Sequence, residues 1–278
     1  MQDASYIKEL KTIGVNRFSI GIQSFFDVDL QYMNRAHNSA EAVSAVKRVQ
    51  DSGFSNITID LIYGTPTMND EQWLQNLETA FSLDVPHISS YALTVEPKTT
   101  LENRISKSQS KPVNEEQSAS QFKMLMAEMK RNGFEQYEIS NFANDGMYAL
   151  HNSSYWRGKK YLGLGPSAHS YNLVSRRWNI ANTIAYASSL EKNQLNFEEE
   201  NLTPAQQVNE KIMTGLRTKW GFGIMNCELR VMSEIQENLK SINADYYTLQ
   251  NGILKLTDAG KLFADAIASQ LFVDEAQD

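Results

Sequence analysis

Polar side chains stand in or beside three predicted strands. Gln23, Asp60 and Glu96 each lie within or just after an apolar stretch. Amide and carboxylate oxygens accept hydrogen bonds from hydroxyl and amino groups, so these residues could hold a small polar ligand. Burial of a carboxylate is costly unless it is hydrogen-bonded, which favours a functional role for Asp60. Gln23 could equally be a ligand donor or an amide that closes a loop, and Arg35, taken alone, is typical of a charged surface.

The four histidines divide into two pairs. His37 and His87 lack a pattern of partners, and we expect them to be structural or exposed. His151 and His169 lie in one loop-rich stretch, residues 148–170, that is dense in aromatic residues and glycine. Both could be ordinary core histidines, but a planar aromatic cofactor that carries a metal would need such surroundings.

Strands and helices alternate through the first half of the chain. Apolar residues at every second position predict strands, and apolar residues at every third or fourth position predict helices. The predicted strands are residues 15–25, 57–63, 88–94 and 134–139, and the predicted helices are residues 5–13, 39–52, 70–81 and 114–131. Such alternation is typical of βα units around a parallel sheet, in which the chemistry lies at the carboxyl ends of the strands.

The second half of the chain has a different pattern. Residues 193–201 are polar and acidic, and we expect them to be a linker between domains. From Thr203 the pattern predicts two helices, a hairpin at Asn251-Gly252 and a last helix capped by Thr257. This order is the outline of a winged-helix domain. Acidic and glutamine side chains crowd its helices, so we expect packing against the main domain rather than DNA binding.

Composition excludes several classes of protein. The 278 residues carry a net charge of −7, whereas a nucleic-acid binder would usually be basic, so we expect no nucleic-acid partner. No run of about eighteen apolar residues is present, so no transmembrane helix is expected. The N-terminus lacks the apolar core of a signal peptide. The single cysteine, Cys227, excludes an internal disulfide, fits a cytoplasmic protein and cannot by itself hold an iron–sulfur cluster.

Seven motifs in a fixed order carry a family resemblance. They read GVNRFSIGIQSF (14–25), NRAHN (34–38), ITIDLIYGTP (57–66), SSYALTVEPKT (89–99), QYEISNFA (136–143), HNSSYW (151–156) and YLGLGPSAHS (161–170). With them the chain resembles the radical S-adenosylmethionine (SAM) proteins related to oxygen-independent coproporphyrinogen III oxidase. It is most similar to their heme chaperone branch, HemW, whose hallmark is HNxxYW. The resemblance covers nearly the whole chain.

The resemblance implies an α/β fold, the C-terminal part of a partial (β/α)6 radical SAM barrel followed by a small α+β winged-helix-like domain. Residues 1–100 would hold the last three βα units, residues 101–200 the extension with HNxxYW, and residues 201–278 the C-terminal domain. Family members begin with three further strands and a Cys-x-x-x-Cys-x-x-Cys loop for a [4Fe–4S] cluster. This sequence has neither, so we expect an N-terminally truncated chain whose exposed edge at the first strand favours a homodimer.

The resemblance also implies binding residues. It assigns four SAM contacts, with Gln23 and Asp60 at the ribose, Arg35 at the methionyl carboxylate and Ala92 beside the adenine. It associates heme with His151 of HNSSYW. Lys98 stands where the family commonly has glycine, which puts the conformation of that turn in question.

Two functions from different classes follow from the resemblance. The first is a heme-binding protein that carries heme to recipient proteins in the cytoplasm, with SAM and a [4Fe–4S] cluster as cofactors of full-length members. The alternative is an enzyme, an oxygen-independent coproporphyrinogen III oxidase, which would decarboxylate two propionates oxidatively with a 5′-deoxyadenosyl radical. The HNSSYW motif favours the chaperone. No catalytic residue is assigned, and whether this chain is an enzyme stays open.

Overall fold

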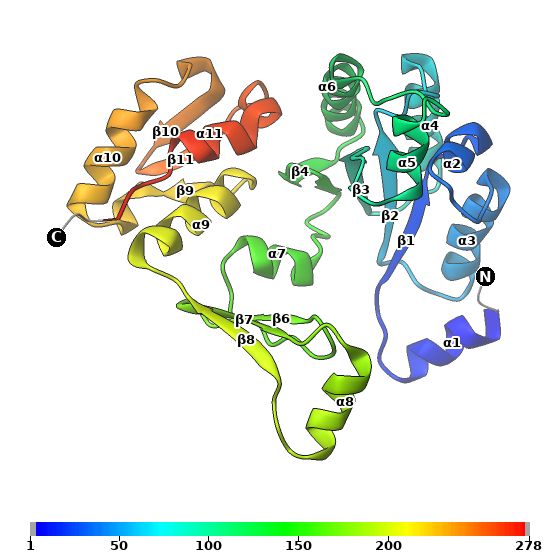
Figure 1. Ribbon diagram of the computed structural model, residues 1–278. Helices are drawn as coiled ribbons and strands as arrows, with labels where there is room; N and C mark the ends of the chain where they lie inside the picture. The colour runs from blue at the N-terminus through cyan, green and yellow to red at the C-terminus, as the bar shows by residue number, and fades with distance from the viewer. Residues whose placement is uncertain (1–3, 276–278) are drawn as a thin grey trace. The chain divides into compact units, whose positions relative to one another are not determined.

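The computed structural model describes residues 4–275 of the chain. Its internal contacts divide it into two compact units, with the boundary between Tyr148 and Ala149. Strands and helices alternate in the first unit, as predicted, whereas antiparallel strands and helices make up the second (Figure 1). The α/β fold class is therefore confirmed. The division into three domains at residues 100 and 200 stays a prediction.

A five-stranded sheet forms the centre of the first unit. Its strands are β1 (Phe18–Gln23), β2 (Ile57–Tyr63), β3 (His87–Ala92), β4 (Glu135–Glu138) and β5 (Asn141–Ala143), in the spatial order β1-β2-β3-β5-β4. β1, β2 and β3 are parallel neighbours, as expected for βα units. β5 runs antiparallel to both β3 and β4, so the sheet is mixed.

Several helices of the first unit begin at side-chain caps. They are α1 (Ala4–Thr12), α2 (Asp27–Tyr32), α3 (Ser39–Asp51), α4 (Asp70–Ser82), α5 (Thr100–Ser106) and α6 (Glu115–Arg131). Asn38 and Asn69 each form a reciprocal capping box at the start of α3 and α4, and the Asn114 side chain caps α6. Trp73 of α4 is fully buried, and its indole donates to the Gln121 carbonyl oxygen at 3.0 Å. This bond joins α4 to α6.

The two faces of this sheet differ in chemistry. On one face, Tyr63 of β2 stacks on Phe122 of α6 and contacts Trp73 of α4, so these helices cover an apolar surface. Alternate residues point to the opposite face. We call this opposite face, which carries Ser19, Gly21, Thr58, Asp60, Ser89 and Tyr91, the polar face of the sheet.

The second unit begins with a helix and a three-stranded antiparallel sheet. Its first elements are α7 (Leu150–Trp156), β6 (His169–Tyr171), β7 (Ser175–Asn179), α8 (Thr183–Glu191) and β8 (Phe197–Asn201), with the strand order β6-β7-β8. Side chains join the last two strands. Ser175 donates to the Glu199 carboxylate at 2.7 Å, and the Trp178 indole donates to that of Glu198 at 3.1 Å.

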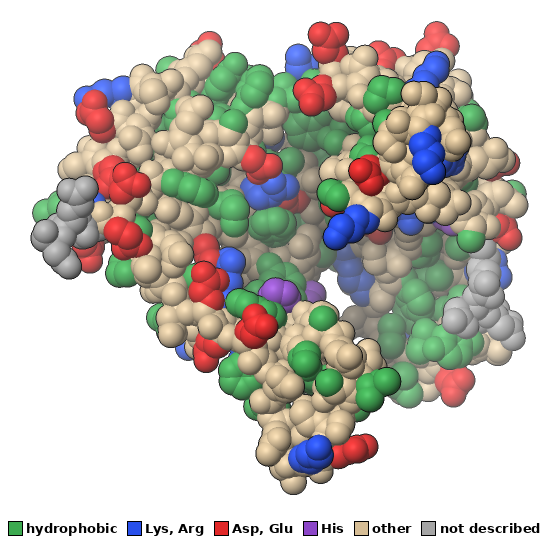
Figure 2. Space-filling view, viewed as in Figure 1, with side chains coloured by type: hydrophobic (Ala, Val, Ile, Leu, Met, Phe, Trp, Pro, Cys, Tyr) green, Lys and Arg blue, Asp and Glu red, His purple; other side chains and the backbone are tan. Residues whose placement is uncertain are grey.

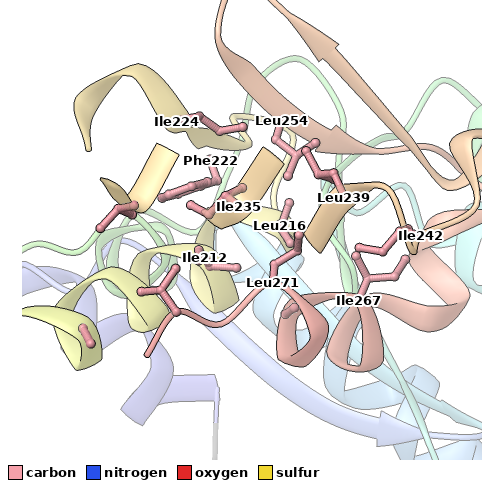
Figure 3. Packing of buried hydrophobic residues seen from close by; sticks show 14 residues of the cluster. Ile212, Leu216, Phe222, Ile224, Ile235, Leu239, Ile242, Leu254, Ile267 and Leu271 are labelled. Carbon is pink, nitrogen blue, oxygen red and sulfur yellow. The ribbon is translucent and has the colours of Figure 1, made fainter. Parts of the chain in front are cut away.

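The C-terminal part of the second unit is a small α+β assembly. It contains α9 (Pro204–Leu216), β9 (Phe222–Gly223), α10 (Leu229–Leu239), β10 (Tyr247–Gln250), β11 (Ile253–Leu256) and α11 (Ala264–Gln270), with short 3₁₀ turns between them. A hairpin at Asn251-Gly252 joins β10 to β11, as predicted, and β9 pairs with β11. Figure 3 shows Ile212, Leu254 and Leu271 among the buried side chains that form its core. This arrangement agrees with the winged-helix-like prediction.

Several sequence expectations were wrong in detail. The stretch HNSSYW lies in the helix α7 rather than in a loop. Residues 193–201 include the strand β8 rather than forming a linker. Thr257 accepts a hydrogen bond from the Gly260 backbone at the start of a 3₁₀ turn, and α11 begins only after that turn.

Candidate functional site

Asp60 lies in the middle of the polar face. In the register of the parallel strands it stands between Gly21 of β1 and Ser89 of β3. The Ser19 hydroxyl lies 3.5 Å from its Oδ2. Burial raises the pKa of the Asp60 carboxyl, while hydrogen bonds from Ser89 and Ser19 and the positive charge of Arg17 oppose that rise. The carboxylate is thus half-buried and hydrogen-bonded, as its cost of burial requires.

Gln23 lies beside Asp60 because the end of β1 is irregular. The register shifts between Gly21 and Gln23, and Gln23 has a φ of 71°. Its side chain folds back over Gly21, where a Cβ atom would lie 2.7 Å from the Gln23 Nε2. A Cβ atom at this position would displace the amide, so Gly21 allows a hydrogen-bonding group to lie next to the strand position that pairs with Asp60.

The structure assembles three of the four predicted SAM-contact residues on one sheet. Gln23, Asp60 and Ala92 belong to the neighbouring strands β1, β2 and β3, and Ala92 is exposed at the carboxyl end of β3. Arg35 lies outside the sheet, just after α2, and is exposed. Glu96, the third polar candidate, is also exposed and lies beyond the end of β3.

A buried carboxylate that the sequence analysis missed joins the loops after β1 and β2. Asp29 is fully buried and accepts hydrogen bonds from Ser24 at 2.8 Å and Thr67 at 2.6 Å, with Thr65 at 3.4 Å. Asn76 of α4 accepts from the Phe25 backbone at 2.6 Å. These bonds fix the chain directly after Gln23. The signal in the sequence was weak, because Asp29 lies in an ordinary amphipathic turn.

His87 lies at the amino end of β3 on the polar face. It is buried, and its Nε2 lies 2.8 Å from the Tyr137 hydroxyl. Burial, assisted by the positive charge of Arg17, lowers the pKa of His87 to about 3. The imidazole is therefore neutral at physiological pH, and it is structural, as expected.

In the second unit, His151 is exposed on α7. Its Nε2 lies 3.0 Å from the hydroxyl of Tyr155, one helical turn further on, and the two rings meet edge to face with centroids 5.0 Å apart. Leu150, beside it, is 80% exposed. Trp156 lies on the other side of the helix, under the guanidinium of Arg217 from α9, with 5.2 Å between that group and the ring centroid. A polar ring nitrogen and apolar surface thus lie side by side.

His169 lies on the strand β6 of the same unit, within the stretch that the sequence had indicated to be rich in loops. It is exposed, and its ring centroid lies 6.0 Å from that of Trp178 on β7. A Cβ atom on Gly163 would lie 2.2 Å from the His169 carbonyl oxygen, so this glycine is needed for the close approach of two backbone segments. Figure 2 shows histidine side chains at the surface near α7 and β6.

The described residues contain neither a metal-binding cluster nor a helix that could cross a membrane. Between residues 4 and 275, no group of three or more His, Cys, Asp or Glu side chains could hold a metal ion. Burial raises the pKa of the Cys227 thiol, which disfavours the thiolate that a metal requires. The residues present therefore do not fit an iron–sulfur cluster. In the same part of the chain, no helix has the length and apolar character needed to cross a membrane.

Comparison with known proteins first defines a class. The model of the family described as the Radical SAM superfamily matches residues 2–80. The fold resembles that of the radical SAM enzyme coproporphyrinogen III oxidase (HemN) from Escherichia coli, with a TM-score of 0.77 and 17% identity over 98% of this chain and 67% of that chain. The protein therefore has a radical SAM fold, a superfamily that implies SAM and an iron–sulfur cluster as cofactors.

Sequence relatives then identify the family. Heme chaperone HemW of Haemophilus influenzae is 30% identical over 98% of this chain and 71% of the relative, and that of Mycobacterium tuberculosis is 30% identical over 96% and 68%. The chain belongs to the HemW family, as its motifs indicated. Heme chaperone HemW of Bacillus subtilis is 35% identical over 78% of this chain, and the match spans 58% of that relative's length.

Proposed function

We propose that this chain binds heme at His151 and passes it to a recipient protein, as a heme chaperone. The observation that carries the proposal is the exposed imidazole in the helix of the HNSSYW motif, in a chain of the HemW family. An imidazole nitrogen is a common axial ligand of heme iron. The exposed Leu150 and the ring of Tyr155 would offer apolar contact to the macrocycle.

The rest of α7 supports the presentation of His151. Trp156 and Arg217 pack against each other, and Arg157 lies over the ring of Trp220 at 5.4 Å. Cation–π contacts of this kind hold the helix against the C-terminal part of its unit. The imidazole is thus carried on a fixed element but remains open to solvent, as a site that both accepts and releases its cargo requires.

We further propose that the polar face of the first unit binds SAM. Asp60 would accept hydrogen bonds from the ribose hydroxyls, and the Gln23 amide could donate to them. Ala92, which is exposed at the carboxyl end of β3 rather than on the polar face itself, would leave space for the flat adenine. Arg35 would pair with the methionyl carboxylate. The cluster ligands are not among the described residues, so the proposal for this chain is limited to nucleoside binding.

The expected partners are heme and heme-recipient proteins. The single cysteine is consistent with a reducing compartment, and we place the protein in the cytoplasm. The oxidase reaction remains the alternative from the sequence. We favour the chaperone because the relatives from Bacillus subtilis, Mycobacterium tuberculosis and Haemophilus influenzae, which match at 30–35% identity, are named heme chaperones. The similarity to the oxidase at 17% identity concerns the fold.

Heme titration tests the proposal. Heme is added to the wild-type chain and to the variants His151→Ala and His169→Ala, while the Soret band is followed and circular dichroism checks each fold. We expect His151→Ala to lose at least tenfold in affinity with an altered spectrum, and His169→Ala, the matched control, to behave as wild type. A folded His151→Ala variant with unchanged affinity and spectrum would contradict the proposal. A change confined to His169→Ala would move the heme site to the loop at residues 161–170.

A further inference from the structure

We propose that the Tyr155 hydroxyl is a latch on His151, which occupies the imidazole Nε2 in the heme-free protein and must leave it when heme iron binds. The inference rests on the proposed heme function of His151. It starts from the 3.0 Å contact between the Tyr155 hydroxyl and the His151 Nε2. The two residues are four apart on α7, so the helix itself brings them to the same face.

The position of Tyr155 is fixed independently of His151. Its ring meets that of Tyr161 edge to face, with centroids 4.7 Å apart. Tyr161 is held in turn by Tyr171 of β6, because each backbone N–H donates to the carbonyl oxygen of the other at 3.0 Å. The Tyr155 ring therefore stands on a framework of backbone hydrogen bonds, and its hydroxyl is aimed at the imidazole.

The chemistry of imidazole makes the two partners of Nε2 mutually exclusive. A neutral imidazole has one nitrogen lone pair, and a hydroxyl that donates to Nε2 uses the pair that iron would take. Nδ1 lies next to Cβ and is the more hindered nitrogen for a group as large as heme. Heme binding at Nε2 therefore forms an iron–nitrogen bond and breaks the O–H···N bond, while the proton stays on Tyr155, whose hydroxyl turns to water. Release reverses both changes.

The latch would lower heme affinity without abolishing it. The net contribution of a single hydrogen bond corresponds to roughly a two- to tenfold change in an equilibrium constant, with exposed bonds at the lower end. A hydroxyl that competes for the same nitrogen also favours dissociation. Weaker heme binding suits a carrier, because the heme must be released to the recipient protein.

The test compares Tyr155→Phe with wild type in the full chain. Phenylalanine keeps the edge-to-face contacts with His151 and Tyr161 and removes only the hydroxyl. We expect hemin to bind Tyr155→Phe two- to tenfold more tightly and to leave it more slowly when apomyoglobin is the acceptor. Tyr161→Phe, which removes the neighbouring hydroxyl, should bind as wild type. The double variant His151→Ala, Tyr155→Phe should lose the gain.

A measurement without heme provides a second readout. Donation from Tyr155 to Nε2 places the imidazole proton of His151 on Nδ1, and nitrogen NMR of the heme-free chain reports that tautomer. We expect wild type to favour Nδ1–H and Tyr155→Phe to lose this preference. An unchanged tautomer, or a Tyr155→Phe affinity equal to or below that of wild type, overturns the latch.

The latch and the heme function fail in different ways. If His151→Ala binds hemin as wild type does, the proposed function is wrong and the latch with it. If His151→Ala loses affinity but Tyr155→Phe gains none, the heme site stands and only the latch is wrong.

Discussion

The imidazole of His87 is buried against Tyr137, and its Nδ1 has no hydrogen-bond partner among residues 4–275. Its folded pKa of about 3 lies well below the ordinary value of 6.5. Above about pH 6.5 the group is neutral in both the folded and the unfolded chain. As the pH falls from about 6.5 toward 3, His87 binds a proton in the unfolded chain but stays neutral in the folded chain. The free energy of unfolding therefore decreases.

This residue gives the first prediction. Between pH 7 and pH 3.5, His87 should account for a loss of about 3–5 kcal/mol in the free energy of unfolding. His87→Gln should remove that part of the pH dependence, because an amide does not titrate, while the exposed His169→Gln should keep it. Urea unfolding at a series of pH values measures both. Equal pH slopes for wild type and His87→Gln would show that the imidazole is not the titrating group.

Asp29 gives the second prediction at the residue scale. Its carboxylate accepts the hydroxyls of Ser24 and Thr67 in a fully buried place. Asp29→Ala should lower the free energy of unfolding by about 2–4 kcal/mol, because these hydroxyls would remain buried without their acceptor. Asp51→Ala on the exposed end of α3 serves as the control, with an expected change within about 0.5 kcal/mol. A thermal shift no larger than that of the control would refute the role of Asp29.

The turn after β3 is strained at one position. Lys98 has a φ of 65°, in the left-handed region that lysine disfavours. Its backbone N–H donates to the Glu102 carboxylate at 2.9 Å, which holds the turn at the start of α5. The sequence raised the question of this turn because glycine is common here in the family. In the structure, Lys98 adopts the left-handed conformation that glycine would adopt more easily.

Lys98→Gly should therefore stabilise the protein. Relief of the left-handed conformation should contribute about 0.5–1 kcal/mol after the greater entropy of glycine in the unfolded chain is subtracted. Lys107→Gly, at the end of α5, where φ is −88°, is the control and should not stabilise. Differential scanning calorimetry measures both melting temperatures. A lower melting temperature for Lys98→Gly than for wild type would contradict the argument.

Some elements could be predicted from local chemistry and others could not. The starts of the helices near residues 70, 114 and 203 and the hairpin at Asn251-Gly252 could be predicted, because caps and turns depend on neighbouring residues. β8 was missed because its glutamates suggested a linker. Their partners, Ser175 and Trp178, lie on another strand and cannot be read from the run itself.

The candidate site shows the same limit. The motifs pointed to Gln23, Asp60, Ala92 and His151. The structure adds that the Gln23 amide lies over Gly21, the residue that pairs with Asp60 across the two strands. The bond between His151 and Tyr155 was hidden because HNSSYW has weak helix formers, and its helix depends on packing around Trp156. The roles of these side chains in binding stay predictions.

At the scale of the whole molecule, β1 forms one edge of the five-stranded sheet. The Phe18 N–H donates inward, to the Asn56 carbonyl oxygen at 3.1 Å, so the alternating N–H groups of Ser19 and Gly21 point away from β2. Such an edge is a template for another strand. It is the physical basis of the homodimer that we propose for this chain.

Amide hydrogen exchange tests this association. The amides of Ser19 and Gly21 should exchange rapidly in dilute protein and become protected as concentration rises, whereas the Ile20 amide should be protected throughout. Light scattering on the same samples should show mass increasing with concentration. A monomer at every concentration, with Ser19 and Gly21 always unprotected, would exclude association through this edge.

The buried indole of Trp73 gives the protein a natural optical label. The other tryptophans, Trp156, Trp178 and Trp220, all belong to the second unit, so Trp73 alone emits from the first. A variant with phenylalanine at the other three positions would report the melting of the first unit by the red shift of a single fluorophore. In the wild-type chain, heme bound at His151 would quench Trp156, which lies on the same helix, by energy transfer. Emission would then distinguish loading of the cargo from unfolding of the sheet.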